Sequence, residues 1–163
     1  MEFFDSHAHY DDEQFKEDRE ELIQLIYHAG VTKFMSAGYD VLSSKMGLEL
    51  ANKYEFIFNT SGISPNDVQD TIQGTETQIR EIEKIIQEDR NNSQIKSRRS
   101  KIVGVGEIGL DYHWNQGNKE IQRFAFIEQI NMANRFELPI IIHTREAVMD
   151  TIRSEERRVG KEC

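Results

Sequence analysis

The sequence predicts an α/β fold in which parallel strands alternate with helices. Short apolar segments alternate with segments whose apolar residues recur at helical spacing, and this order repeats along the chain. A strand followed by a helix and then by another strand pairs in parallel through a right-handed crossover. Polar side chains also fall at the ends of several expected strands, where active sites of such folds are built. Periodicity alone leaves two architectures open, an open doubly wound sheet and a closed (β/α)₈ barrel.

The first two strand and helix pairs lie in the N-terminal third of the chain. Residues 2–9, EFFDSHAH, form a short apolar strand with a polar end. Residues 18–30 form a helix that ends at Gly30, because glycine readily adopts the left-handed conformation of a helix end. Residues 31–38 form the second strand and residues 42–54 the second helix. The same unit therefore occurs twice before the middle of the chain.

The middle of the chain predicts a third and a fourth strand around one helix. Residues 56–64 form the third strand, and residues 75–89 form a helix with isoleucines along one face and Thr75 as its cap. Residues 90–100 are polar and partly basic, and we expect a surface loop there. A DNA-binding patch is the weaker interpretation because the segment lacks interleaved aromatic residues. Residues 101–110, KIVGVGEIGL, form a buried fourth strand.

One long helix and one more strand follow. Residues 120–137 carry apolar side chains at helical spacing, including Phe124, Ile127 and Phe136. Residues 138–143, LPIIIH, form the fifth strand, and a further helix begins within residues 145–152. Five strand and helix units are therefore expected.

Composition predicts one soluble domain. The 163 residues are 37% hydrophobic and 30% charged, and the formal net charge is -9. That charge argues against broad adsorption to nucleic acid, although a local site could still bind a phosphate through metals. The first residues resemble neither a signal peptide nor a membrane span, and Cys163 is the single cysteine. We therefore expect a cytoplasmic protein with no membrane partner and no intramolecular disulfide.

Two histidines, one glutamate and a third histidine occur at expected strand ends. They are His7, His9, Glu107 and His143. Residues two apart in an extended segment point to the same side, so His7 and His9 could bind one cation. Neutral imidazoles with a carboxylate suit zinc, manganese, cobalt or iron. The alternative is that the histidines are polar side chains on a solvent-exposed strand face.

Three blocks of the sequence resemble the TatD family of metal-dependent deoxyribonucleases, members of the amidohydrolase superfamily. The blocks are DSHAHYD at residues 5–11, GEIGLDYH at residues 106–113 and LPIIIHTREA at residues 138–147. They follow one another in the family's order, and the resemblance covers nearly all of residues 1–152. It implies a TIM-barrel (β/α)₈ fold, with only about the first five βα units present in this chain.

The resemblance also implies a site with two divalent metal ions, Mg, Mn or Zn. His7 and His9 would bind one ion and His143 the other, while Glu107 would be shared by both ions and act in catalysis. The implied reaction is cleavage of DNA phosphodiester bonds by a metal-activated water, with low sequence specificity, in a monomeric enzyme.

Two further residues, Asp111 and Arg145, fall in the same blocks and are assigned to substrate binding. Asp111 would orient a ligand or a water molecule, and Arg145 would meet a phosphate oxygen. The alternative for each residue is a salt bridge or a cap at a strand end.

The sequence also departs from the family pattern. Where the family commonly has G-[IV]-H-P-H, this chain reads GISPN, so Ser64 and Asn66 replace two histidines. A later metal-binding histidine and a late aspartate of the family have no counterpart in the 163 residues. Asp150 is no substitute for that aspartate, because it lies within the helix that follows His143.

The end of the chain predicts a boundary after Ile152. Residues 153–163, RSEERRVGKEC, interrupt the helical pattern and resemble the translated start of a common sequencing adaptor. We therefore expect residues 1–152 to be the N-terminal part of a TatD-like metallohydrolase barrel and residues 153–163 to be a non-native tail. The alternative is an ordinary charged helix end.

Three functional interpretations follow. The first is a TatD-like deoxyribonuclease. The second is another hydrolase of the same superfamily that acts on a small ester, amide or phosphoester. The third is a noncatalytic truncated fragment, because five strands cannot close an eight-stranded barrel.

Overall fold

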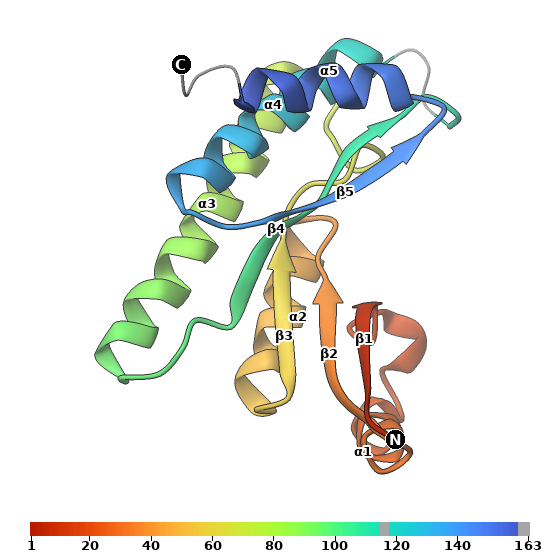
Figure 1. The fold of residues 1–163 in the computed structure, drawn as a ribbon, viewed down its shortest axis with the longest axis vertical. Coiled ribbons are helices and arrows are strands. Elements are labelled where there is room, and N and C mark those ends of the chain that lie inside the picture. The colour runs from red at the N-terminus through yellow and green to blue at the C-terminus, as the bar shows by residue number, and fades with distance from the viewer. Residues whose placement is uncertain (115–117, 160–163) are drawn as a thin grey trace.

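A computed structural model of the chain describes residues 1–114 and 118–159, and it contains one parallel sheet. The strands pair in the order β1-β2-β3-β4-β5, and every pair is parallel. Their bounds are β1 Phe3–Ala8, β2 Val31–Ala37, β3 Ile57–Ser61, β4 Ile102–Asp111 and β5 Ile140–Arg145. Figure 1 shows β1 and β5 at the two ends of this series. The predicted α/β class is therefore confirmed.

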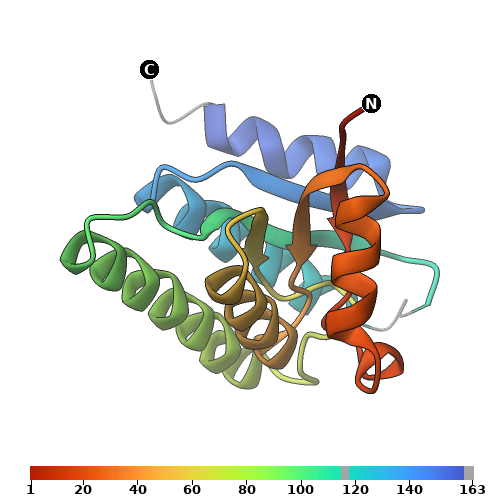
Figure 2. The same cartoon turned by 90° about the horizontal axis from the view of Figure 1, so that it is seen from below.

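Among the described residues, four helices and the 3₁₀ helix η1 lie between the strands, and a fifth helix, α5, follows β5. They are η1 Glu13–Phe15, α1 Arg19–His28, α2 Val41–Lys53, α3 Ile72–Ile95, α4 Lys119–Arg135 and α5 Val148–Val159. Figure 2 shows α2 and α3 side by side on one side of the sheet. Within the described ranges, no helix combines the length and the apolar character needed to cross a membrane.

Helix α3 is longer than the sequence pattern predicts at both ends. It begins at Ile72, and the Thr71 side chain caps it by accepting a hydrogen bond from the Gly74 N–H. The predicted cap, Thr75, is instead buried within the first turns of the helix. The helix also continues to Ile95, so the loop expected from residue 90 is wrong in its first half. The polar residues there extend the solvent-exposed side of a helix whose other side is buried.

Two separate clusters of buried apolar side chains hold the sheet and helices together. The N-terminal cluster consists of Ala8, Ile23, Phe34, Ala51 and Ile57. The central cluster is larger and fills the space between β4, α3 and α4. Its fully or nearly fully buried members include Ile63, Ile82, Ile86, Ile102, Val105, Ile108, Leu110, Phe126, Ile130 and Met132.

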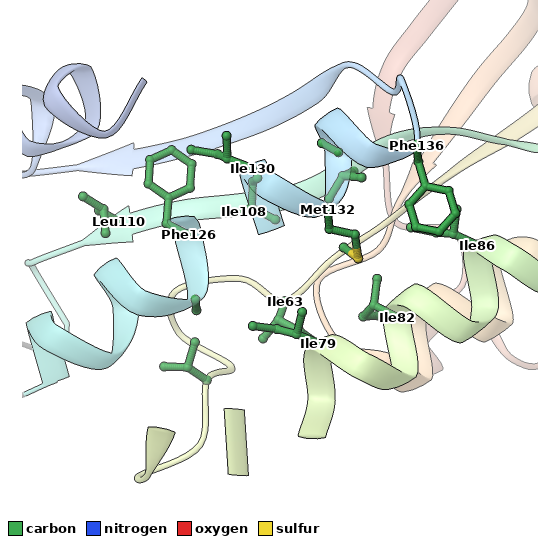
Figure 3. Close-up of a cluster of buried hydrophobic side chains, with 14 of the residues drawn as sticks. Ile63, Ile79, Ile82, Ile86, Ile108, Leu110, Phe126, Ile130, Met132 and Phe136 are labelled. Atoms are coloured by element: carbon green, nitrogen blue, oxygen red, sulfur yellow. The ribbon is translucent and has the colours of Figure 1, made fainter. Parts of the chain in front are cut away.

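Figure 3 shows the contact between α3 and α4 in the central cluster. Ile82 and Ile86 of α3 face Met132 of α4 and Phe136 directly after that helix, and all four side chains are buried. The isoleucine spacing in α3 and the apolar spacing in α4 therefore form one interface. Helix α4 of this interface also packs on β4, the strand that carries Glu107.

A buried carboxylate fixes the start of β4. Asp89 on α3 accepts hydrogen bonds from the backbone N–H groups of Lys101 and Ile102, at 2.8 and 3.1 Å. Ser100 donates a third hydrogen bond through its hydroxyl. Because backbone donors at a strand start need partners, this carboxylate sets where β4 begins.

The last strand and helix extend past the expected boundaries. β5 continues beyond His143 to Arg145, and α5 continues across the boundary expected after Ile152. The last four residues of the expected non-native tail, residues 160–163, lie outside the described residues. The division after Ile152 stays a prediction.

Candidate metal centre

The curvature of the sheet brings side chains of β1, β4 and β5 together. His7 lies on β1 and His9 directly follows it, while Glu107 lies on β4 and His143 on β5. Two strands separate β1 from β4 in the sheet, yet His7 Nε2 is 3.5 Å from Glu107 Oε2. Such an approach is typical of a sheet that curls toward a barrel.

His7, His9 and Glu107 form a cluster of metal-ligating atoms. The Nε2 atoms of the two histidines are 3.1 Å apart. One ligand atom from each of the three residues lies within 4.8 Å of the others. Both nitrogens and the carboxylate oxygen therefore point into one small space.

The donor atoms of this cluster fit one divalent cation. Nitrogen ligands about 2.0–2.1 Å from a tetrahedral zinc ion lie roughly 3.3 Å from one another. The observed separations of 3.1 Å between the histidines and 3.5 Å to the carboxylate are close to that value. The residue types, two imidazoles and a carboxylate, are also ligands that zinc, manganese and iron accept.

Packing holds the His9 ring at this position. The ring meets that of Tyr39 edge to face, at 5.6 Å between centroids. His9 Nδ1 is buried and has no hydrogen-bond partner among the described residues.

Two residues after His9, the Asp11 carboxylate is buried and accepts a hydrogen bond from Ser36. Burial raises the pKa of Asp11 above its ordinary value.

His143 joins two carboxylates. Its Nδ1 is 2.9 Å from Glu107 Oε1, and its Nε2 is 2.9 Å from Asp111 Oδ2. Carboxylates only accept hydrogen bonds, so both contacts are hydrogen bonds when both ring nitrogens carry a proton. His143 therefore lies beside Glu107, but it is not among the three residues whose ligand atoms converge in the described part of the chain.

Asp111 is buried at the end of β4, and both of its oxygens have partners. Oδ2 accepts from His143 and from the Asn66 amide at 3.2 Å, while Oδ1 accepts from the backbone N–H groups of His113 and Trp114. Burial alone would raise the pKa of Asp111. These hydrogen bonds to the ionised form outweigh burial and hold the pKa of Asp111 below its ordinary value.

Ser64 and Asn66 take part in this network through different carboxylates. Asn66 donates to Asp111, and the Ser64 hydroxyl donates to Asp67. Burial raises the pKa of Asp67, and the nearby carboxylates of Asp40 and Glu107 add to this effect. Sequence reasoning noted the two positions only as departures, and it missed the contact of Asn66 with a residue 45 positions away.

Arg145, at the end of β5, lies over an aromatic ring. Its guanidinium carbon is 5.2 Å from the centre of the Trp114 ring, and the Arg145 side chain is exposed. The structure therefore brings Arg145 to the same strand ends as His143 and Asp111. Among the described residues, the three convergent ligand atoms come from His7, His9 and Glu107, and the contact found for the Arg145 guanidinium is with the Trp114 ring.

Comparisons with known proteins identify the family of the chain. The family described as TatD related DNase matches residues 4–162. A protein of Bacillus subtilis named "Uncharacterized metal-dependent hydrolase YabD" is 36% identical over 149 residues, which are 91% of this chain and 53% of that protein. The "3'-5' ssDNA/RNA exonuclease TatD" of Escherichia coli K12 is 27% identical over 144 residues, 88% of this chain and 50% of that protein.

A solved structure shares the fold. The crystal structure of YjjV, a TatD homologue from Escherichia coli K12, superposes with a TM-score of 0.77 at 26% identity. The match covers 96% of this chain and 56% of that chain. This chain thus spans about half the length of the curated relatives it matches. The resemblance read from the three sequence blocks is confirmed, and the chain belongs to the TatD-related DNase family.

Proposed function

We propose that the protein containing this chain is a metal-dependent phosphodiesterase that cleaves single-stranded nucleic acid with low sequence specificity. The observation that carries this proposal is the convergence of His7, His9 and Glu107 beside His143 and Asp111. Support also comes from relatives named as hydrolases and as ssDNA/RNA exonucleases. Because the chain spans about half of those relatives, the proposal concerns the whole protein.

In this proposal His7, His9 and Glu107 hold a divalent cation. Activation of water and neutralisation of phosphate charge are the chemistry that such a cation supplies when bound. The two oxygens of Glu107 face different partners, His7 and His143. Glu107 is therefore suited to be shared between two cations, with His143 as a ligand of the second.

Asp111 acts on the site by positioning His143. Its carboxylate is buried and fully engaged in hydrogen bonds, which suits a residue that orients a ring more than one that meets a substrate. The partner of a ligating histidine fixes which nitrogen carries the proton. Arg145, in contrast, is exposed and supplies a fixed positive charge that suits a phosphate oxygen.

A second candidate function is hydrolysis of a small ester, amide or phosphoester on the same residues. The observation that favours it is the engagement of Ser64 with Asp67 and of Asn66 with Asp111. Two side chains that the resemblance assigns to the place of histidines are thus turned toward carboxylates. A smaller substrate would need fewer contacts there.

The test uses protein expressed from the complete reading frame that encodes these residues. After chelation, Mg²⁺, Mn²⁺ and Zn²⁺ are added separately, and cleavage of 5′-labelled single-stranded DNA is followed on gels. We expect metal-dependent cleavage that is lost in His7→Ala and Glu107→Gln. The matched control is His28→Ala, because His28 is exposed on α1 and its contacts among the described residues, with the Gln24 carbonyl and the Tyr27 ring, lie within that helix.

Other results would change the assignment. Hydrolysis of small esters without cleavage of DNA would favour the second candidate. Failure to hydrolyse either class with any of the three metals would overturn both candidates and leave a noncatalytic protein.

A further inference from the structure

Trp114 is the single tryptophan of the chain, and its side chain lies largely in solvent. Its exposed fraction is 70%, although large aromatic side chains are usually mostly buried. It follows β4 closely, three residues after Asp111, at the carboxyl end of the sheet. Trp114 therefore lies at the end of the sheet where the active sites of such folds are built.

Neighbouring side chains hold the exposed ring in a defined place. The Arg145 guanidinium lies over the ring at 5.2 Å, and the His113 ring meets it edge to face at 4.7 Å. His113 Nδ1 is in turn 2.7 Å from Glu146 Oε1. The ends of β4 and β5 thus both contribute to the surroundings of the ring, which remains open to solvent.

The ring is connected to the candidate metal centre through Asp111. One oxygen of Asp111 accepts the backbone N–H groups of His113 and Trp114, and the other contacts His143. Arg145 is two residues after His143 on β5, so both side chains point to the same side of the strand. The ring and the metal-binding side chains therefore share one end of the sheet.

The overall charge makes a stacking contact useful here. A formal net charge of -9 argues against broad adsorption to a phosphate backbone. Stacking of a base on an aromatic side chain does not depend on net charge, and every base offers a flat face. A base inside a duplex is already stacked on its neighbours, so only unpaired bases can use such a ring.

We propose that Trp114 is a stacking platform for an unpaired nucleobase, with Arg145 beside it to meet the adjoining phosphate. The platform would hold single-stranded substrate while a neighbouring phosphodiester lies at the candidate metal centre. This inference rests on the proposed function, since it names the residue that selects single strands for that same site. The Arg145 guanidinium serves both neighbours, because a planar cation packs on aromatic rings and pairs with phosphate.

The test measures binding separately from hydrolysis. Protein from the complete reading frame is titrated against a fluorescein-labelled oligothymidylate and an abasic oligonucleotide of equal length, with anisotropy as the readout. We expect Trp114→Leu to weaken binding of oligothymidylate on the order of 10- to 100-fold, and Trp114→Phe to retain most of the affinity. Binding of the abasic oligonucleotide should be weaker in the unsubstituted protein and should change little in Trp114→Leu.

Tyr27→Leu is the matched control. Tyr27 is a partly exposed aromatic residue near the end of α1, where its ring packs on Phe56. This substitution should leave both affinities unchanged. The stacking contribution should also persist at high salt, because stacking releases no counterions.

The failing results are distinct for the two proposals. Equal affinity of Trp114→Leu and the unsubstituted protein for oligothymidylate would overturn the platform. An equal loss of affinity of Trp114→Leu for the base-containing and the abasic oligonucleotide would also overturn the platform. Absence of oligothymidylate binding by the unsubstituted protein would overturn it as well. Failure of the unsubstituted protein to hydrolyse any phosphodiester would overturn the proposed function, whereas base-dependent binding through Trp114 would still support the platform.

Discussion

The strand that carries His7 and the strand that carries Glu107 differ in how firmly they are packed. On β1, Phe3 and Phe4 are 53% and 59% exposed, and Ala8 is the strand's only buried residue. On β4, nearly every residue is buried under the central cluster. The candidate metal centre therefore joins a lightly packed strand to a firmly packed one.

Pairing of the strands shows the same contrast. The ladder between β1 and β2 is irregular between Asp5 and Ala8, the stretch that contains His7. Regions with few buried apolar contacts open locally at lower free energy than the core. The comparison teaches that Glu107 lies on a firmly packed strand, whereas His7 lies on a stretch with an irregular ladder and few buried apolar contacts, so a bound cation should affect the position of His7 more.

The largest expected effect on the free energy of unfolding comes from removing a buried phenylalanine side chain from either of the two apolar clusters. Phe126 of the central cluster and Phe34 of the N-terminal cluster are both fully buried. Phe126→Ala should lower the free energy of unfolding by about 3–5 kcal/mol. The loss for Phe34→Ala should lie near the lower end of that range, because side chains near the β1 edge can relax into the cavity that the ring leaves. Urea unfolding followed by circular dichroism measures both values, and a larger loss at Phe34 would contradict the contrast.

Metal addition should stabilise the lightly packed strand most. A cation present at 100 times its dissociation constant stabilises the folded protein by about 2.7 kcal/mol. Hydrogen exchange measured by mass spectrometry should slow in β1 on addition of Mn²⁺ and change less in β4. His7→Ala should abolish the difference. Uniform slowing along the chain would speak against a ligand-dependent β1.

Asp111→Asn tests whether Asp111, at the end of the firmly packed strand β4, orients His143. Loss of the ionised partner of His143 should weaken metal affinity about 10- to 100-fold, as measured by isothermal titration calorimetry. Asp150→Asn is the matched control, because Asp150 on α5 accepts from Tyr112 and Arg123, away from His143. Unchanged affinity in Asp111→Asn would remove its positioning role.

The smallest effects are expected at two helix caps. Asp40 caps α2 in a reciprocal pair with Ser43, and Thr71 caps α3 with a single hydrogen bond. Asp40→Ala should lower stability by about 1 kcal/mol and Thr71→Ala by about half as much. Thermal unfolding measures both losses of stability. A larger loss for Thr71→Ala would show that α3 depends more on its cap than α2 does.

Much of the fold follows from local patterns in the sequence. The alternation of strands and helices was predictable because apolar periodicity reports which side of each element is buried. The full length of α3 was not, since its last turns are polar and resemble a loop. Burial of Asp89 there depends on the start of β4, which comes later in the chain and whose backbone N–H groups donate to its carboxylate.

The candidate site was predictable in part for a similar reason. Strand-end positions made His7, Glu107 and His143 candidates, because parallel strands bring their carboxyl ends together. The sequence could not predict which partners these residues choose. The contact of Asn66 with Asp111 depends on the path of the segment after β3, and the exposure of Trp114 depends on how the ends of β4 and β5 meet.

The carboxylate of Asp89 has a consequence for protein engineering. The segment between α3 and β4 is polar and exposed or half-buried, features that usually mark a safe place to insert a tag or a second domain. Here Arg98, Ser100 and Lys101 all donate to Asp89, so an insertion between them would separate donors that share one acceptor. New termini of circular permutants and insertion sites of fusions should therefore be placed elsewhere on the surface, although this loop has the polar composition of a tolerant site.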